Sequence, residues 1–551
     1  MGILFGSCNS SPIPSPQVSP VIGEIISRDA IASTSIANGS QALFHATGGA
    51  TINNQIFTFS NGTWQNDNGE SILIDSSVET KLTALYPAYS DERLITDNPY
   101  DNDTLQDVLI AQSTFKDQTN IQLNFRHLFS RLTIHIHSSI AEEIEAVKIE
   151  VPKVVSIDPS NGTFTTSGTH STSPLETNTG VYSCIVPSLP NCPVKLTFIF
   201  NTGKEVTHSL THTFVSGHKY ECHVNRPGIR NAEDLIDFYT LISCPYNYKG
   251  NKTLKDFGEE FGDRTIYRLL EDITLTEKQC NNLNSIGNNQ YPFDDIFDGE
   301  GHKISKLKIK AFDGHAGFFG YISEKGCVRN LRLDSCYSQT ITKSSGSGAG
   351  ILSGICQGII NNCRITNSSI SNEDDSPTGA IAGLASGEII NCSVENTTII
   401  ATTLALGSIT GNLDKGKIFN CYASDNTIEN KTGNTNARGG IAGNSINGEI
   451  QNCYVYNNSY DSRSKNKGQF IGIASNTTLK HCYYDISKST FPLIKEATNC
   501  TATPNYKYNT SFKTTINDST LHISESLNQW IGKQKIYRRW TSDNGGPPYF
   551  E

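Results

Sequence analysis

The sequence lacks the features that would favour a membrane-spanning or nucleic-acid-binding protein. It has one Met and three Trp in 551 residues. No run of eighteen apolar residues occurs, so no segment is expected to cross a bilayer as a helix. The net charge of −10 is spread without long blocks of one sign, so we expect no nucleic-acid partner and no polyanion partner. Asn, Ser, Thr, Ile and 45 Gly dominate instead, and they favour an all-β fold of short strands and tight turns.

Familiar catalytic motifs are also missing. The sequence contains no nucleophile elbow, zinc-protease helix, P-loop or dinucleotide fingerprint. We therefore expect no cofactor and no bound metal. Fifteen cysteines are present, but they lack the dense clustering of small disulfide-stapled scaffolds. Cys184, Cys192 and Cys222 could pair two at a time, and the sequence leaves the pairing open.

The first residues resemble the end of a bacterial lipoprotein signal. Gly6 and Ser7 precede Cys8, which the resemblance implies is acylated, anchoring the chain to the outer membrane. Phe5 in place of the usual Leu and the absence of a charged leader depart from that pattern. The Ser- and Pro-rich stretch that follows completes a signal tail and tether over residues 1–24. The alternative is an N-terminal linker with a chance cysteine.

Residues 25–225 show alternating apolar and polar runs separated by turn residues. Examples are IFTF, LTALYP, IQLNF, RLTIHIH and VKLTFIF. Period-two alternation bounded by Asn-Gly, Asp and Pro predicts the half-buried strands of a β-sandwich.

The order of landmarks in this region resembles the fimbrillin-like family of Bacteroidales surface subunits. The landmarks are FTFSNGTW with Trp64, Ala84-Leu-Tyr86-Pro87, Asp107 to Ala111, Leu123 to His127, Ile185-Val-Pro187 and Gly217-His-Lys-Tyr220. The resemblance implies a transthyretin-like β-sandwich that is displayed on the cell surface, polymerises into fimbriae and accepts a donor strand after cleavage near the N-terminus. Arg28 is the candidate cleavage site, and the alternative is a surface arginine. The long chain that follows this domain favours a terminal or accessory position over repeated polymerisation.

Two histidine pairs occur on predicted strands of the sandwich. His135 and His137 alternate with isoleucines, and His208 and His212 lie four residues apart, so each pair points to one face of its strand. Two histidines on one face can contribute to a metal site. No Cys or carboxylate has suitable spacing nearby, so we interpret them as solvent-facing strand positions.

The second half of the sequence contains an internal repeat. An Asn-Cys or His-Cys pair recurs with spacings of 29, 29, 32 and 29 residues at Cys363, Cys392, Cys421, Cys453 and Cys482. Each pair follows two glycine motifs, such as Gly379-Ala-Ile-Ala-Gly383 and Gly387-Glu-Ile-Ile-Asn391. A period near thirty, with glycine turns and no room for a helix, predicts a parallel β-helix in which equivalent residues form ladders. We expect the isoleucines and cysteines to be buried and Asn362, Asn391, Asn420 and Asn452 to lie at stacked bends.

The same motifs resemble the GLUG repeat family of large bacterial surface proteins. The repeats and the segments that flank them divide the second half into leading coils and a cap over 226–305, repeats over 306–490 and a C-terminal cap over 491–551. One cysteine per coil could form a redox or metal ladder. Cys is, however, among the residues most often simply buried, and we predict core packing.

The predicted function is a cell-surface adhesin or an accessory or tip component of a fimbria, and not an enzyme. Its expected partners are a host or bacterial surface protein or glycan, other fimbrial subunits and the outer membrane. The alternative is a β-helix polysaccharide lyase or hydrolase, which needs clustered carboxylates. Candidate acids are Asp294, Asp295, Asp298, Asp374 and Asp375, all at predicted turns. Candidate stacking surfaces for a ligand are Tyr454, Tyr456, Tyr460, Tyr483 and Tyr484, which could equally cap the coils.

Overall fold

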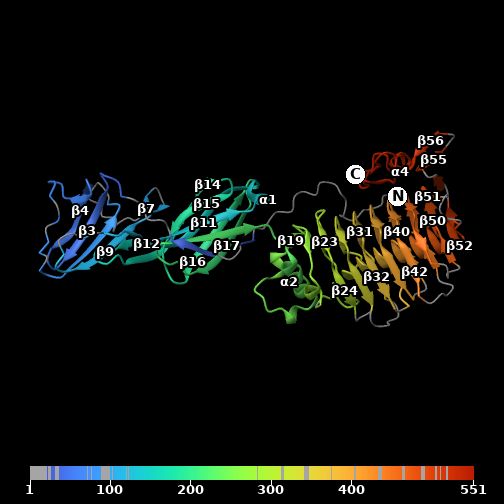
Figure 1. Cartoon of the computed structure of the whole chain (residues 1–551), viewed down its shortest axis with the longest axis horizontal. Coiled ribbons are helices and arrows are strands. Elements are labelled where there is room, and N and C mark those ends of the chain that lie inside the picture. Colours follow the sequence, from blue (N-terminus) through green and yellow to red (C-terminus); the bar gives the residue numbers. More distant parts are fainter. Residues whose placement is uncertain are drawn as a thin grey trace. The chain divides into compact units, whose positions relative to one another are not determined.

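The computed structural model divides the chain into two compact units, one of Val18–Arg226 and one that contains Pro227–Glu551. Strands dominate both units (Figure 1). The structure describes residues 21–22, 26–30, 36–70, 72, 74–75, 77–88, 100–101, 104–118, 121, 123–281, 283–311, 315–340, 347–373, 375–402, 405–431, 437–461, 466–485, 491–502, 505–508, 511–516 and 519–551.

The N-terminal unit contains three main sheets. One sheet runs β10 (Arg126–His127), β9 (Leu109–Phe115), β6 (Thr80–Tyr86), β3 (Gln41–Thr47), β4 (Ile52–Ser60) and β5 (Thr63–Gln65). The second runs β13 (Phe164–Thr172), β12 (Ile144–Ile157), β16 (Cys192–Phe200) and β17 (Glu205–His212). The third runs β1 (Val21–Ile22), β18 (His218–Asn225), β11 (Ser130–Ile136), β15 (Val181–Val186) and β14 (Leu175–Asn178), with β2 (Ile26–Ala30) also paired to β18.

The second and third sheets form a sandwich because the apolar residues of β11 and β18 share one core with those of β12 and β16. Strand β12 has fourteen residues and links two cores. Ile149 lies in the core between these two sheets, whereas Val154 and Ile157 pack with Leu43 and Ile110 of the first sheet. The alternation of apolar and polar residues therefore predicted the buried faces of the strands.

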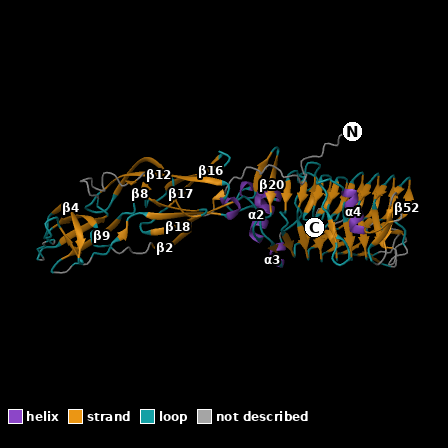
Figure 2. Cartoon of the chain, turned by 90° about the horizontal axis from the view of Figure 1, so that it is seen from above, coloured by secondary structure: helices purple, strands orange, loops and turns teal. Residues whose placement is uncertain are grey.

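The C-terminal unit is a stack of parallel coils, visible as a row of arrows in Figure 2. Equivalent strands of successive coils pair in parallel and form long sheets. One ten-stranded sheet runs from β19 (Gly258–Phe261) to β53 (Thr501–Ala502), and a seven-stranded sheet runs from β25 (Phe319–Ile322) to β52 (Ile494–Thr498). A six-stranded sheet runs from β24 (Lys308–Ala311) to β47 (Ser459–Tyr460), and a four-stranded sheet from β33 (Thr378–Gly379) to β48 (Asn466–Gly468).

The nine-stranded sheet of this unit carries the candidate site, and we call it sheet G. Its strands are β21 (Ile273–Thr274), β23 (Lys303–Ser305), β27 (Arg332–Asp334), β31 (Arg364–Thr366), β36 (Ser393–Glu395), β41 (Tyr422–Ser424), β46 (Tyr454–Tyr456), β51 (Cys482–Asp485) and β54 (Asn505–Tyr508). The central residue of the three-residue strands points inward, as Ile365 and Val394 do, so the residues on either side of it face outward.

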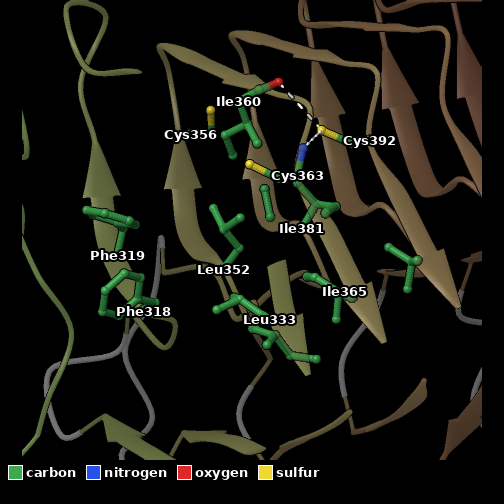
Figure 3. Close-up of a cluster of buried hydrophobic side chains, with 14 of the residues drawn as sticks. Phe318, Phe319, Leu333, Leu352, Cys356, Ile360, Cys363, Ile365, Ile381 and Cys392 are labelled. Carbon is green, nitrogen blue, oxygen red and sulfur yellow. Dashed lines mark hydrogen bonds between the residues drawn. The ribbon is translucent and has the colours of Figure 1, made fainter. Parts of the chain in front are cut away.

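Each coil buries its repeated apolar residues in a single continuous core. Figure 3 shows Cys363 and Cys392 pointing into this core beside Ile360, Ile365 and Ile381. The backbone N–H of Cys363 donates to the Cys392 sulfur at 3.4 Å, and that thiol contacts the Ile360 carbonyl at 3.7 Å. The cysteine of one coil thus contacts the next coil in the stack.

Helices appear at both ends of the solenoid, which the reading of a nearly all-β chain did not predict. Helix α2 (Ala232–Ser243) begins at Asn231, whose side chain accepts from the Asp234 N–H at 2.9 Å. Helix α4 (Ile523–Ile531) lies in the C-terminal segment, which we define as residues 511–551. In Figure 1 this segment (red) lies on the flank of the coils, beside β40 (Lys417–Phe419) and β51. Within the described residues, no helix is both long and apolar enough to cross a membrane.

The predicted all-β fold, with a sandwich followed by a parallel β-helix, is confirmed. The solenoid extends beyond the predicted repeat range at both ends. Strands β20 (Arg264–Arg268) and β22 (Ile296–Asp298) already pair in parallel before residue 306, and β52, β53 and β54 continue the sheets after residue 490. These outer coils lack the Gly and Asn-Cys spacing of the central ones. Leading coils were expected over 226–305 from the flanking motifs, whereas the strands after residue 490 fall in the segment expected to be a cap.

Candidate functional site

One outward-facing column of sheet G changes character along the stack. It is formed by the first outward residue of the seven strands from β23 to β51, and we call it the outer column: Lys303, Arg332, Arg364, Ser393, Tyr422, Tyr454 and Tyr483. Neighbouring strands lie about 4.8 Å apart. The column is therefore cationic over its first three coils and aromatic over its last three.

The C-terminal segment covers the aromatic end of the outer column. Tyr454 and Tyr483 are 1% and 0% exposed. The Tyr454 hydroxyl donates to the Pro548 carbonyl, and the Tyr483 hydroxyl is 2.7 Å from the Ser526 hydroxyl. Trp540 packs against Tyr454 with ring centroids 5.5 Å apart. Tyr454 and Tyr483 thus belong to an aromatic core under α4 and offer no stacking surface to a ligand.

A ladder of asparagines joins the C-terminal segment to the coils. Asn362, Asn391, Asn420 and Asn452 all have positive φ, between 53° and 55°, a conformation that Asn tolerates better than most residues. The Asn452 amide donates to Asn420 at 2.7 Å, and the Asn420 amide donates to Asn391 at 2.7 Å. The bend before each cysteine is therefore linked to the bend of the next coil.

The same asparagines bind the backbone of the C-terminal segment. The Asn391 amide donates to the Ile536 carbonyl at 2.8 Å, and its oxygen accepts from the Arg538 N–H at 2.9 Å. The Trp540 indole N–H donates to the Asn420 oxygen at 2.6 Å. Two of these bonds come from the main chain of Ile536 and Arg538 and one from the side chain of Trp540. Together they fix the position of the C-terminal segment along the ladder.

A pocket opens where the C-terminal segment ends and the cationic part of the outer column begins. Its volume is about 440 Å³. We call it the flank pocket, and its lining residues are Gly301, Asn330, Arg332, Asn362, Cys363, Arg364, Asn391, Ser393, Tyr422, Arg538, Tyr549, Phe550 and Glu551. Three of these carry a guanidinium group, two from the outer column and one from the C-terminal segment.

Two of the three guanidiniums have protein partners. Arg364 pairs with Glu395 at 2.8 Å, and Arg538 donates to the Asn362 oxygen at 2.7 Å and to the Glu551 carbonyl. Within the described part of the chain, the side chain of Arg332 makes no hydrogen bond or ion pair. The pKa of Arg538 is lowered, first by burial and then by the positive charges of Arg332 and Arg364.

The pocket is suited to holding an anion and poorly arranged for acid–base chemistry. The Tyr422 hydroxyl donates to Glu395 at 2.6 Å, so this carboxylate is engaged by both Tyr422 and Arg364. Burial and the charge of Glu395 raise the pKa of Tyr422. A base that abstracts a proton works best with a pKa near the operating pH, and Tyr422 is shifted away from it.

The acids proposed for the catalytic alternative do not gather at one site. Asp298 is 4% exposed and pairs with Arg329 at 2.7 Å, inside a buried network with Arg268. Asp295 accepts from the Thr265 N–H at 2.7 Å, and burial raises its pKa. Asp294 and Asp375 are exposed, and Asp374 lies outside the described residues. Asp295 and Asp298 thus take part in contacts within the first coils of the solenoid.

The repeated cysteines lie in the core of the solenoid. Cys363, Cys392, Cys421, Cys453 and Cys482 are at most 1% exposed, and all are thiols. Burial raises the pKa of Cys363 and Cys421 well above the usual value. In the N-terminal unit, Cys184, Cys192 and Cys222 are also thiols, so none of the pairings left open for them occurs.

The other predicted positions are scattered. His135 stacks on His223 of the neighbouring strand, with ring centroids 5.0 Å apart. Among the described residues no group of three or more metal-binding side chains is present. Tyr460 donates to the Gly468 carbonyl at 3.3 Å and packs on Phe491. Tyr456 packs on Phe512 and, like Tyr484, is partly buried.

The two N-terminal sites have different outcomes. Cys8 lies outside the described residues. Arg28 falls within β2, which pairs antiparallel with β18. In this pairing Ser27 lies opposite Tyr220. This strand lies at the edge of the third sheet, beside the strand with which the domain ends.

Sequence reasoning missed the three arginines of the flank pocket. Arg332 and Arg364 each follow the bend asparagine by two positions, so an alignment of the repeats would have placed them in one column. Arg538 carries no such signal because it comes from a segment without a repeat. Its place in the site depends on the fold of the C-terminal segment.

The fold and the site thus define an N-terminal β-sandwich domain joined to a parallel β-solenoid. Residues 25–234 match the family model for fimbrillin-like proteins, so this part of the chain is a fimbrillin-like domain, as the landmarks predicted. The resemblance of the repeats to the GLUG family stays a prediction.

Similar proteins match parts of the chain. A "putative cell adhesion protein" of Bacteroides uniformis is 20% identical, with a TM-score of 0.29, over 35% of this chain and 89% of its own. One of Bacteroides ovatus is 16% identical, with a TM-score of 0.26, over 36% of this chain and 85% of its own. A "putative Gly-rich membrane protein" of Evansella cellulosilytica is 30% identical over 125 residues. That match spans 22% of this chain and only 14% of the relative.

Proposed function

We propose that this protein is a cell-surface adhesin or an accessory or tip component of a fimbria, and that it acts by binding without catalysis. The observation that carries the proposal is a fimbrillin-like domain over residues 25–234 followed by a solenoid of stacked coils. Fimbrillin-like domains serve attachment and assembly. A column of parallel coils offers a long ordered surface for contact with a partner.

The N-terminal unit supplies attachment to the cell and to other subunits. Pairing of β2 with β18 supports a maturation step at Arg28, since cleavage there would divide an edge strand and leave β18 free to pair with a strand from another subunit. Acylation of Cys8 would anchor the domain in the outer membrane. Labelling of cells with a clickable palmitate analogue tests the anchor, with Cys8→Ala as the variant that loses the label.

The solenoid supplies the exposed binding surface. Beside the flank pocket, Glu395 is paired with Arg364 and also accepts from Tyr422, which favours binding over acid–base catalysis. The rival function is a polysaccharide lyase or hydrolase built on the same coils.

A panel of host glycans and matrix proteins separates the two functions. The purified full chain is incubated with each immobilised ligand, and the supernatant is assayed for reducing or unsaturated sugar ends. We expect retention of the protein on at least one ligand and no new sugar ends. Release of such ends would contradict the adhesin function and favour the enzyme.

A further inference from the structure

We propose that the flank pocket binds the carboxylate of an acidic sugar, with Arg332, Arg364 and Arg538 as the anion-binding groups. The inference rests on the proposed adhesin function and deepens it by naming the class of ligand. It also assigns the site to one end of the solenoid flank, where the C-terminal segment leaves the outer column uncovered.

The first argument is the convergence of positive charge. Arg332 and Arg364 occupy paired positions on adjacent strands, and like charges directly opposite each other destabilise a sheet. Arg538 adds a third guanidinium from the C-terminal segment, and its pKa is lowered first by burial and then by the charges of Arg332 and Arg364. A bound anion would relieve this repulsion, and guanidinium groups bind carboxylates in a bidentate geometry.

The second argument is that Arg332 is left for a ligand. Arg364 has Glu395, and Arg538 has Asn362 and the Glu551 carbonyl. Arg332 is exposed, lines the pocket and makes no side-chain hydrogen bond or ion pair among the described residues. It is the cation of this site that a ligand can reach without breaking a protein contact.

The third argument concerns the charges of the lining residues. Arg332, Arg364 and Arg538 line the pocket, and Glu551 is the one acidic residue among the lining residues. Glu395 pairs with Arg364 but does not line the pocket. The lining is therefore richer in cationic than in acidic side chains, which favours an anionic ligand.

The fourth argument favours a sugar over an acidic peptide. Phe550 is packed against Trp540 and Arg538, but Tyr549 lines the pocket and is 37% exposed, so the apolar face of a pyranose ring could stack on the Tyr549 ring. The asparagine amides that line the pocket already bond to one another or to the C-terminal segment. These amides are therefore already used and would not hydrogen-bond the main chain of a bound peptide. A volume of about 440 Å³ suits a small ligand.

The test measures binding of defined sugars to the purified full chain by isothermal titration calorimetry and saturation-transfer NMR. The probes are N-acetylneuraminic acid and glucuronic acid as carboxylated sugars, glucose and N-acetylglucosamine as neutral sugars, glucosamine 6-sulfate as a sulfated sugar and a triglutamate peptide. We expect a carboxylated sugar to bind at least tenfold more tightly than the neutral, sulfated and peptide probes.

The decisive variant is Arg332→Gln, because this side chain is exposed and makes no hydrogen bond or ion pair with the described residues. We expect it to weaken binding of the carboxylated sugar at least tenfold with an unchanged melting temperature. Arg539→Gln is the matched control, since Arg539 is the exposed neighbour of Arg538, donates to the Gly532 carbonyl at 2.9 Å and does not line the pocket. The affinity of the Arg539→Gln variant for the carboxylated sugar should equal that of the native protein.

Several results would overturn the inference. They are no binding of either carboxylated sugar, equal binding by Arg332→Gln, or tighter binding of the neutral, sulfated or peptide probe. The panel assay of the proposed function is independent of this test, because a different face could mediate attachment. Attachment without binding of the carboxylated sugars would overturn only the flank pocket, whereas release of sugar ends would overturn the adhesin function.

Discussion

The two units build β-structure in different ways. In the solenoid, most strands have three to five residues and pair in parallel with the equivalent strand about thirty residues away, as β31 does with β36. In the N-terminal unit, strands reach fourteen residues and pair mainly antiparallel, and partners such as β11 and β18 are far apart in sequence. The period of the sequence therefore determines the register of the solenoid, whereas the sandwich depends on matching of long apolar faces.

The two ends of the outer column differ in a similar way. Its aromatic end is buried by the C-terminal segment, while its cationic end stays exposed at the flank pocket. Equivalent positions of the outer column thus have different roles. In the aromatic coils they stabilise the fold, and in the cationic coils they are available to a ligand. This difference separates the residues whose substitution should affect stability from those whose substitution should affect binding.

The largest expected effect comes from matched core truncations. Ile389 in the solenoid and Ile149 in the sandwich are both 0% exposed. Truncation of each to Ala should lower the stability of its own unit by about 2–5 kcal/mol through the cavity that it leaves. Hydrogen exchange read by mass spectrometry should show loss of protection only in the unit that carries the change. Equal loss of protection in both units would contradict the expectation that each truncation destabilises only its own unit.

The asparagine ladder should show the next largest effect. Asn420→Ala removes the bonds of Asn420 to Asn391, Asn452 and Trp540 and places Ala at a positive φ. We expect a loss of about 2–4 kcal/mol, measured by chemical denaturation. Asn420→Gly loses the same bonds but tolerates the backbone, so it should recover about 1 kcal/mol. Equal stability of the two variants would mean that the bend is not strained.

Alkaline pH should weaken both units through their buried thiols. Burial raises the pKa of Cys222 in the sandwich and of Cys356 in the solenoid to about 12. The unfolded thiols lose their protons near pH 8.5, so between pH 9 and 12 the folded state holds more protons than the unfolded state, and stability falls as pH rises. Each thiol should cost about 2 kcal/mol at pH 10, because pH 10 lies about 1.5 units above the pKa of the unfolded thiol and below that of the folded one. Calorimetric scans from pH 7 to pH 10 measure this, and Cys222→Ala should reduce the slope for the sandwich.

Removal of the indole N–H at the aromatic end should have a smaller effect. Trp540→Phe keeps an aromatic ring against Tyr454 but loses the bond to Asn420. We expect a loss of about 1 kcal/mol and faster hydrogen exchange within residues 519–551. Trp530→Phe, in the same segment but without a bond to the ladder among the described contacts, serves as the control. Unchanged exchange in Trp540→Phe would show that the ladder does not hold the segment.

The smallest expected effect lies at the cationic end. Arg332→Gln relieves repulsion from Arg364 and breaks no described contact, so its stability should stay within about 0.5 kcal/mol of the native protein. Thermal unfolding monitored by circular dichroism measures this. A loss above 1 kcal/mol would indicate that Arg332 is structural.

The sequence predicted most where residues repeat. The asparagines and cysteines recur at a fixed spacing, and this spacing predicted the parallel coils and the inward cysteines. It did not predict helix α2, although Asn231 followed by Glu233 and Asp234 is a good helix start. It could not predict the flank pocket, because Arg538 and Trp540 reach the coils from a segment without periodicity. Contacts of that kind depend on tertiary packing, which local patterns do not encode.

A quartz crystal microbalance tests most directly whether the protein binds its surface ligand without degrading it. A layer of the glycan selected from the panel is exposed to the full chain and then eluted with high salt. The predicted result is a rise in mass during exposure and a return to the original baseline after elution. A final mass below the baseline would mean that the layer has been cleaved, and it would contradict the account of a non-catalytic adhesin.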